Sequence, residues 1–197
     1  GHVWLLNAAG ACIPYSVAQG KITHIILVSR HQAYINIDGQ GMYVLDMQTR
    51  QLRALPVHAS EMTAGFIDRH HRLWTYQSAG ILSCYDGRNV NSYHLLEAGT
   101  NNQRVPQFCD TGSHGLFFLS PAGELVRIMN GKLETVNLSD TDGGQQQLYS
   151  MHTDSQQLLW LTSGNDGVYR ICFPSRQFRQ VDFPFNKKEK SGVRALF

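Results

Sequence analysis

The sequence predicts an all-β fold, and three observations support this class. One segment is repeated: Asp68–Tyr85 and Asp154–Phe173 each place an Asp six residues before a Trp, a Leu directly before that Trp, and a Gly six or seven residues after it. Asp–Gly and Asn–Gly pairs separate the apolar stretches, and such pairs favour tight hairpin turns. No stretch of ten residues shows the apolar period of an amphipathic helix.

Aromatic residues mark the period of the repeat. The anchors Trp4, Tyr34, Trp74, Phe117 and Trp160 follow one another at intervals of 30, 40, 43 and 43 residues. A period of about 40 residues without helical patterning is typical of a β-propeller, in which each repeat forms one four-stranded antiparallel blade. The sequence therefore predicts a propeller with about four complete blades and a partial blade at each end.

The repeat also divides the chain in order. We expect a partial blade at 1–20, complete blades at 21–56, 61–96, 105–138 and 147–183, and the first strand of another blade at 191–197. Inner strands such as 24–28 and 80–85 are apolar on both faces, as expected between two neighbouring blades. The chain is interpreted as a fragment of a larger propeller, and the alternative is a closed five-bladed ring that joins its two ends.

Composition narrows the possible partners. The chain of 197 residues is 42% hydrophobic and 16% charged, which is typical of a globular protein. A formal net charge of +2 gives no strong field for nucleic acid, so no nucleic-acid partner is predicted. No apolar run approaches the ~20 residues of a membrane helix, so this segment is predicted to make no membrane contact.

Three acids invite an acid–base interpretation, because glycoside hydrolases use spaced carboxylates. Asp68, Asp110 and Asp154, however, each come where the first strand of a blade ends. A side chain that recurs with the repeat serves the repeat, so we expect these acids to accept backbone N–H bonds in the first turn of each blade. The aromatic anchors are expected to pack between blades rather than to bind a ligand.

Other reactive residues form no recognisable site in the sequence. The nine histidines include no HxH or HExxH pair and the four cysteines no CxxC pair, so no metal site is predicted. Cys12, Cys84 and Cys172 hold similar third-strand positions in different blades, which favours small buried side chains over disulfides. Nucleophile and phosphate-binding motifs are missing, so we predict no catalytic residue and no cofactor.

Ligand binding in a propeller is expected on the face made by the second-to-third and fourth-to-first strand connections. On that face the sequence places the candidate ligand-binding residues Asp38, Gln40, Gln77, Asn165 and Asp166. Longer polar connections, which commonly carry binding functions, also reach this face. A small-molecule ligand is therefore the partner that the sequence predicts.

The best-preserved copies resemble the two-component regulator propeller repeat. The matching segments are 149–154, 159–162 and 167–170, and Met62–Gly87 is the next best copy. Tyr34 and Phe117 depart from the Trp of this pattern. The resemblance implies the periplasmic sensor region of a bacterial hybrid two-component histidine kinase, anchored in the inner membrane through parts not in this chain. It also implies an oligosaccharide ligand, further blades of the same polypeptide as packing partners, and a homodimeric parent receptor.

Three functions compete at this stage. The first is a non-catalytic module that senses a ligand for a signalling receptor, with signalling done by other domains. The second is a propeller enzyme, a lyase or a glycoside-active protein, which needs His and acidic side chains over the channel. The third is a protein-interaction propeller similar to the WD-repeat type, although no Gly–His and Trp–Asp pairs bracket the blades.

Overall fold

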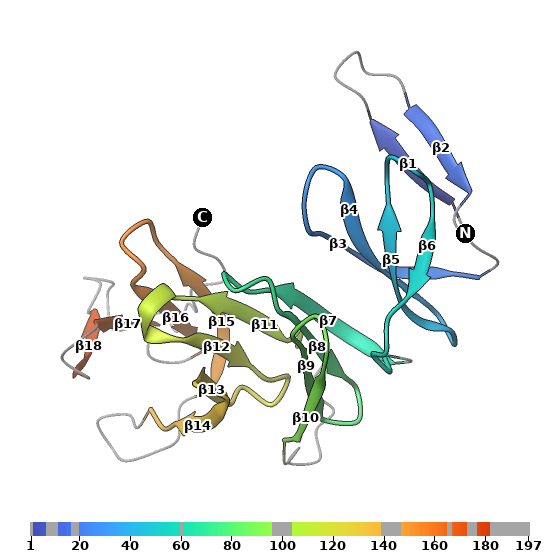
Figure 1. The fold of residues 1–197 in the computed structure, drawn as a ribbon. Helices are drawn as coiled ribbons and strands as arrows, with labels where there is room; N and C mark the ends of the chain where they lie inside the picture. Colours follow the sequence, from blue (N-terminus) through green and yellow to red (C-terminus); the bar gives the residue numbers. More distant parts are fainter. Residues whose placement is uncertain are drawn as a thin grey trace. The chain divides into compact units, whose positions relative to one another are not determined.

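The computed structural model describes residues 2–6, 12–16, 20–59, 61–95, 104–138, 147–164, 167–172 and 177–181. The chain divides into two compact units, Gly1–Leu96 and Glu97–Phe197, and each is described by itself. Figure 1 shows the strands that make up both units. The expected first strand of a further blade at 191–197 lies outside the described residues.

The first unit holds one two-stranded sheet and two four-stranded sheets. Strands β1 (His2–Leu6) and β2 (Cys12–Ser16) pair antiparallel. The next sheet is β3 (Ile22–Leu27), β4 (Gln32–Ile37), β5 (Gly41–Asp46) and β6 (Leu52–Ala54), and the last is β7 (Met62–Ile67), β8 (Leu73–Gln77), β9 (Ile81–Tyr85) and β10 (Val90–His94). In both four-stranded sheets every strand pairs antiparallel with the next one along the chain.

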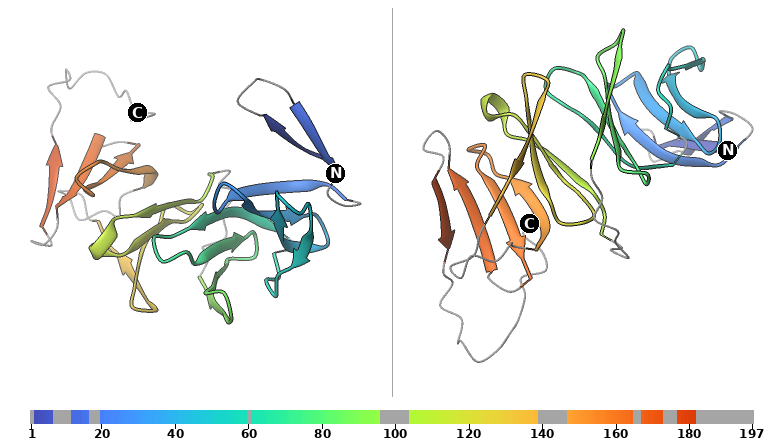
Figure 2. Two further views of the ribbon diagram at one scale, coloured as in Figure 1. Left: turned by 45° about the horizontal axis from the view of Figure 1, so that its top comes forward. Right: turned by 90° about the horizontal axis from the view of Figure 1, so that it is seen from below.

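The second unit contains two more four-stranded antiparallel sheets of the same kind (Figure 2). Its first sheet is β11 (Gln107–Asp110), β12 (Leu116–Leu119), β13 (Leu125–Met129) and β14 (Lys132–Val136), with a short 3₁₀ helix η1 (Gly112–His114) between β11 and β12. Its second sheet is β15 (Leu148–Thr153), β16 (Leu159–Ser163), β17 (Gly167–Cys172) and β18 (Gln177–Val181). Among the described residues there is no α-helix, and none of the described segments is a helix long and apolar enough to cross a membrane.

The structure confirms the predicted all-β class and the four-stranded blades. Each four-stranded sheet is a simple meander, in which the strand order along the chain is the order across the sheet. Strand ends differ from the expected ones by one or two residues: the strand expected at 80–85, for example, is Ile81–Tyr85. Such shifts arise because a turn residue next to a strand can either join the hydrogen-bonded ladder or stay outside it. Both cases fit nearly the same pattern of apolar residues.

Apolar side chains fill the space between neighbouring blades within each unit. In the first unit, the blade β3–β6 packs on the blade β7–β10 through a buried cluster that includes Met42, Val44, Met62, Leu73 and Tyr85. In the second unit, the blade β11–β14 packs on β15–β18 through a cluster that includes Phe117, Leu119, Leu125, Met151, Leu159, Leu161 and Ile171. Burial of this apolar area is the main force that holds the sheets together.

Two anchors take the expected place in these cores. Tyr34 packs against the cluster of the first unit, and Phe117 belongs to the cluster of the second unit. Trp74 is also buried, with 1% of its surface exposed, and its ring stacks on Tyr93 with 6.4 Å between ring centroids. Trp160 is only partly buried, and the guanidinium of Arg170 lies over its ring, with 5.8 Å from its central carbon to the ring centroid.

Two expectations about burial are wrong. Strand β3 is not covered on both faces: Ile22, His24 and Ile26 are partly buried, whereas Ile25 and Leu27 on the other face are 49% and 70% exposed. The reason is that alternate residues of a strand point to opposite faces, and only one face of β3 packs on β7.

The second correction concerns the cysteines. Cys84 is buried, as expected, and burial raises the pKa of its thiol to about 11, so it behaves as a small apolar side chain. Cys12 is exposed, because its strand β2 pairs only with β1 among the described residues. The side chain of Cys172 lies outside the described part of the structure.

Candidate functional site

The connections of each blade lie at two ends. First-to-second and third-to-fourth strand turns, such as 28–31 and 47–51, form one end, which we name the Asp end after the residue that closes most of these turns. Second-to-third turns and the links from one blade to the next, such as 38–40 and 55–61, form the opposite end, which we name the pocket end.

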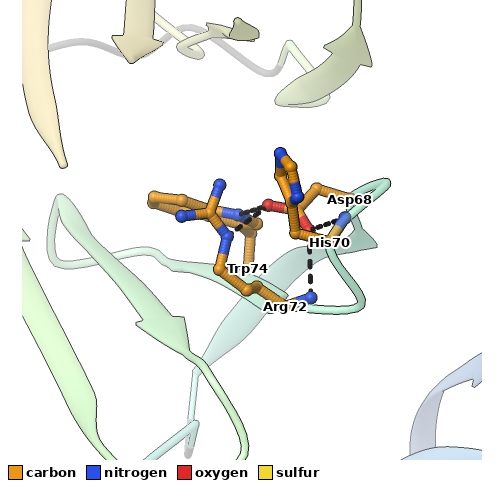
Figure 3. Close-up of polar contacts among 4 residues, drawn as sticks. All are labelled: Asp68, His70, Arg72 and Trp74. Atoms are coloured by element: carbon orange, nitrogen blue, oxygen red, sulfur yellow. Dashed lines mark hydrogen bonds and ion pairs between the residues drawn. The ribbon is translucent and has the colours of Figure 1, made fainter. Parts of the chain in front are cut away.

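At the Asp end, Asp68 is a structural acceptor (Figure 3). Its Oδ1 accepts hydrogen bonds from the backbone N–H groups of His70 and Arg72, both at 2.9 Å. Its Oδ2 accepts from the Arg72 Nε at 2.7 Å and from the Trp74 indole Nε1 at 2.9 Å. With four donors on its two oxygens and 3% of its surface exposed, the carboxylate has no free position for a substrate.

These contacts also set the charge state of Asp68. Burial alone would raise its pKa, but the hydrogen bonds from the Trp74 indole, the Arg72 backbone and the Arg72 side chain outweigh burial and lower the pKa below its ordinary value. The group is thus a carboxylate at neutral pH, unlike a general acid, whose pKa must be raised. The expected structural role is confirmed.

Asp154 repeats the arrangement. Its Oδ1 accepts from the backbone N–H groups of Gln156 and Leu158, and its Oδ2 accepts from the Trp160 indole, all at 2.9 Å. The indole hydrogen bond is the largest cause that lowers the pKa of Asp154. The six-residue interval between Asp and Trp therefore has a direct cause: it brings the indole N–H to the carboxylate across the turn.

Asp110 has the predicted role, because its Oδ1 accepts the backbone N–H of Gly112 at 2.8 Å in the first turn of its blade, but it lies one residue earlier in the turn than Asp68 and Asp154 do. In the turns of Asp68 and Asp154, the N–H of the Asp donates to the carbonyl four residues later, at 3.1 Å in both turns. In β11–β12 this bond runs from Thr111 to Gly115, also at 3.1 Å. Asp110 is one residue earlier, paired with Leu116 at the end of β11. The turn that contains η1 is therefore as long as the other turns, and only the acid is shifted, by one residue.

Counted from the turn, the spacing is the same in all four blades. The bond from residue X to the carbonyl of X+4 begins at Val28, Asp68, Thr111 and Asp154, and the anchor follows six residues later as Tyr34, Trp74, Phe117 and Trp160. Asp occurs only where the anchor is Trp. Among the anchor types Tyr, Phe and Trp only Trp carries a ring N–H, so the acid at the start of the turn and the indole occur as a pair.

The pocket end of the first unit contains a pocket of about 190 Å³. Gly39, Gln40 and Gly41 line it from the β4–β5 turn, and residues 55–59 line it from the link between the blades β3–β6 and β7–β10. Both connections belong to the end on which the sequence predicted ligand binding.

The link 55–59 alternates between buried and exposed residues. Leu55, Val57 and Ala59 are buried in the cluster between the two blades, while Pro56 and His58 are exposed. This period of two is that of an extended segment with one face in the core. It places His58 in the lining of the pocket beside apolar residues of the same link. Pockets for small molecules commonly combine apolar residues with a few polar groups.

The predicted site residues have different outcomes. Gln40 lines the pocket, and Asp38 is exposed in the same turn, where its N–H donates to the Lys21 carbonyl at 2.9 Å. Gln77 does not line the pocket, but its side-chain Nε2 donates to the carbonyl of His58 and so fixes the pocket link. Asn165 and Asp166 lie outside the described residues.

Two polar residues at this end, His58 and Glu61, were missed in the sequence. His58 lines the pocket, and the carboxylate of Glu61 accepts a hydrogen bond from the Ser78 hydroxyl where the link enters β7. The signal for His58 was the alternation of apolar residues in 55–59, which marks an extended link rather than an irregular loop. In the described part of the chain no three His, Cys, Asp or Glu side chains are grouped so that they could hold a metal ion.

Comparison with known proteins supports the fold. No protein-family model matches the sequence, and no curated protein is significantly similar to it. Solved structures are similar at low identity. A streptogramin B lyase is 17% identical with a TM-score of 0.61, over 93% of this chain and 62% of the lyase chain. The virginiamycin B lyase of Staphylococcus aureus is 14% identical with a TM-score of 0.63, over 93% and 63%.

A third similar structure is the extracellular domain of a protein described as a hybrid two-component system, BT3049 of B. thetaiotaomicron. It is 11% identical with a TM-score of 0.56, and the match covers 91% of this chain and 28% of that one. The chain thus spans less than two thirds of each of these three structures. At such identities the likeness shows the fold alone, and together with the four meander sheets it establishes that the fold is a β-propeller.

Proposed function

We propose that the chain is a ligand-sensing propeller module of a two-component signalling receptor, and that it binds an oligosaccharide outside the cytoplasm, in the periplasm. The observation that carries the proposal is the pocket at the pocket end, which is lined by Gln40 and His58 together with apolar residues of the link 55–59. Amide and imidazole groups hydrogen-bond sugar hydroxyls, and apolar lining residues suit the C–H face of a sugar ring. The fold likeness to the extracellular domain of BT3049 supports the same choice.

The size of the pocket limits what it binds. A volume of about 190 Å³ is smaller than the roughly 300–1,000 Å³ of pockets for drug-sized ligands. The pocket therefore accommodates one sugar residue of a longer chain, and the rest of the ligand contacts neighbouring loops. In a homodimeric receptor, such binding shifts the population between two arrangements of the receptor chains, with no chemistry in this module.

The test is titration of the chain with a panel of oligosaccharides by isothermal calorimetry. His58→Ala is expected to weaken binding of the responding sugar about tenfold, because one hydrogen bond to the ligand is lost. His94→Ala, which removes an exposed histidine on the outer strand β10, is the matched control and should leave binding unchanged. Equal effects of the two substitutions, or no binding by any sugar, would contradict the proposal.

A second candidate is a lyase, favoured by the titratable side chains of His58 and Glu61 at the pocket end, since proton abstraction needs such a base. Two of the similar structures are lyases by name. Incubation of the chain with streptogramin B, followed by chromatography, separates this candidate from the first. Conversion that is lost in His58→Ala would favour the enzyme, and an unchanged antibiotic would exclude this activity.

A further inference from the structure

The second unit carries a pair of side chains at its pocket end that the repeat does not explain. The guanidinium of Arg104 lies over the ring of Tyr149, with 4.1 Å from its central carbon to the ring centroid. Arg104 Nη1 donates to the Leu148 carbonyl at 3.0 Å, and Nη2 donates to Gln147 Oε1 at 3.3 Å. The cation is thus held in one orientation by two hydrogen bonds and one aromatic face.

Tyr149 departs from the repeat at a position that two other blades define. Tyr149 lies four residues before the end of its first strand, at the register shift that begins β15. Thr23 and Thr63 lie at this position in β3 and β7, where the same shift occurs. A side chain that recurs serves the fold, as the Asp–Trp pairs show, so a large aromatic in the place of Thr needs another explanation. Tyr149 is also 46% exposed, so burial in the core does not explain why this position holds a large aromatic side chain.

Two glycines leave room for the pair. A Cβ on Gly123 in the β12–β13 turn would come within 2.6 Å of Arg104 Nη1, and the φ of +86° also favours glycine there. A Cβ on Gly164, after β16, would come within 2.5 Å of the Tyr149 ring. Gly164 does not have a positive φ, so its backbone alone does not require glycine. The neighbouring turns are therefore shaped around these two side chains.

The charge of Arg104 is not neutralised within the described structure. The ion pair found among the described residues joins Arg72 and Asp68, and Arg104 makes none there. Its hydrogen bonds to described residues go to two neutral oxygens and use two of the five N–H donors of the guanidinium. Guanidinium N–H groups held in one orientation beside an exposed aromatic ring suit a carboxylate attached to a ring.

We propose that Arg104 and Tyr149 form a binding site for the carboxylate of an acidic sugar, a uronate residue of an oligosaccharide. The uronate carboxylate receives two N–H bonds from Arg104, and the sugar ring contacts Tyr149. This inference rests on the proposed function in that the ligand is an oligosaccharide, but it names a different site and the charge of the sugar.

The test uses trigalacturonic acid and its methyl ester as probes in calorimetric titrations. The free acid is expected to bind at least about tenfold more tightly than the ester, and binding should weaken as the salt concentration rises, since the contact is between charges. Arg104→Gln should abolish this difference between acid and ester. Tyr149→Thr, which installs the residue of the other blades, should weaken the binding of both probes.

Controls separate this site from loss of charge or of folding. Arg53→Gln removes one positive charge from an exposed position on β6 and should leave the preference for the acid intact. Unfolding midpoints of Arg104→Gln and Tyr149→Thr should stay close to that of the parent chain, and Arg104→Lys should recover only part of the binding, because an ammonium cannot form the planar pair.

The outcomes for the two sites differ. Equal affinity for acid and ester, or a preference for the acid that survives Arg104→Gln, would overturn the uronate site. If neutral sugars then still bind in a manner that depends on His58, the proposed function stands without it. Binding of the acid that depends on Arg104 and not on His58 would support the uronate site and contradict the pocket.

Discussion

At the scale of single residues, the Asp–Trp pair explains why the two best copies of the repeat look alike. The carboxylate of Asp68 satisfies the Trp74 indole together with three donors from His70 and Arg72 in the turn. A buried indole N–H without an acceptor costs free energy, so the Trp depends on the acid. In β11–β12 both are replaced, by Thr111 and Phe117.

This pairing predicts strong coupling between the two positions. Asp68→Thr should lower the free energy of unfolding by about 2 kcal/mol, because the indole and the backbone donors of the turn lose their acceptor. In a Trp74→Phe background the same change should cost about 1 kcal/mol less, since the indole is gone. A double-mutant cycle by urea denaturation measures this coupling. Additive effects of the two substitutions would show that the indole contact does not stabilise the fold.

The same carboxylate predicts how stability depends on pH. The folded pKa of Asp68 is lowered, so the folded state binds the proton less readily than the unfolded chain, whose Asp has a pKa of about 3.9. The resulting stability is present above pH about 4 and is lost as the pH falls through the folded pKa. Urea midpoints between pH 6 and 3 should therefore fall less steeply for Asp68→Asn than for the parent chain. Parallel curves would contradict the assignment.

At the scale of elements, the Asp turns repeat a backbone conformation as well as a side chain. His71 and Gln157 lie three residues after their Asp, each with a positive φ, of 58° and 62°. This left-handed conformation is strained for residues with a Cβ. Both residues donate their N–H to the carbonyl of the Asp at 2.9 Å, so the turn requires the strain.

Glycine at these two positions should relieve the strain. We expect His71→Gly and Gln157→Gly each to raise the free energy of unfolding by about 0.5 kcal/mol. This is the net result of two effects: glycine relieves the strain of the folded turn, but it also makes the unfolded chain more flexible, which offsets part of the gain. Ser155→Gly, in the same turn as Gln157 but without a positive φ, should instead lower stability by a similar amount. Thermal unfolding checks all three, and a loss of stability in both His71→Gly and Gln157→Gly would disprove the account.

The sequence predicted these elements well where the side chains obey the repeat. Apolar alternation and turn residues placed the four-stranded blades within one or two residues, and the role of Asp68 and Asp154 followed from recurrence alone. Recurrence also predicted that Asp110 accepts a backbone N–H bond in its turn, but not that it lies one residue earlier, because the hydrogen bonds of the turn and not the identity of the acid define the register. Nor could it find His58 or the contact of Arg104 with Tyr149, since these depend on how links cross the pocket end.

At the scale of the molecule, the inner strand β3 keeps an apolar face in water. Ile25 and Leu27 are 49% and 70% exposed, next to the exposed Thr23 on the same face. Apolar surface of this kind on a strand favours association with another chain or sheet. We expect the double variant Ile25→Thr and Leu27→Thr to have a lower weight-average mass than the parent chain when both are measured by sedimentation at high protein concentration. The exposed pair Arg50→Ala and Arg53→Ala is the control, and an unchanged mass in the Thr double variant would contradict the prediction.

The joint replacement of Asp and Trp has a consequence for how such repeats are recognised. A sequence profile scores each position of the repeat separately. It therefore penalises the β3–β4 and β11–β12 turns twice, once for the missing acid and once for the missing Trp, although the two replacements have one physical cause. The conserved quantity is the six-residue interval from the first donor of the turn to the anchor, and it survives in every described blade. Divergent blades are therefore better detected by spacing than by residue identity.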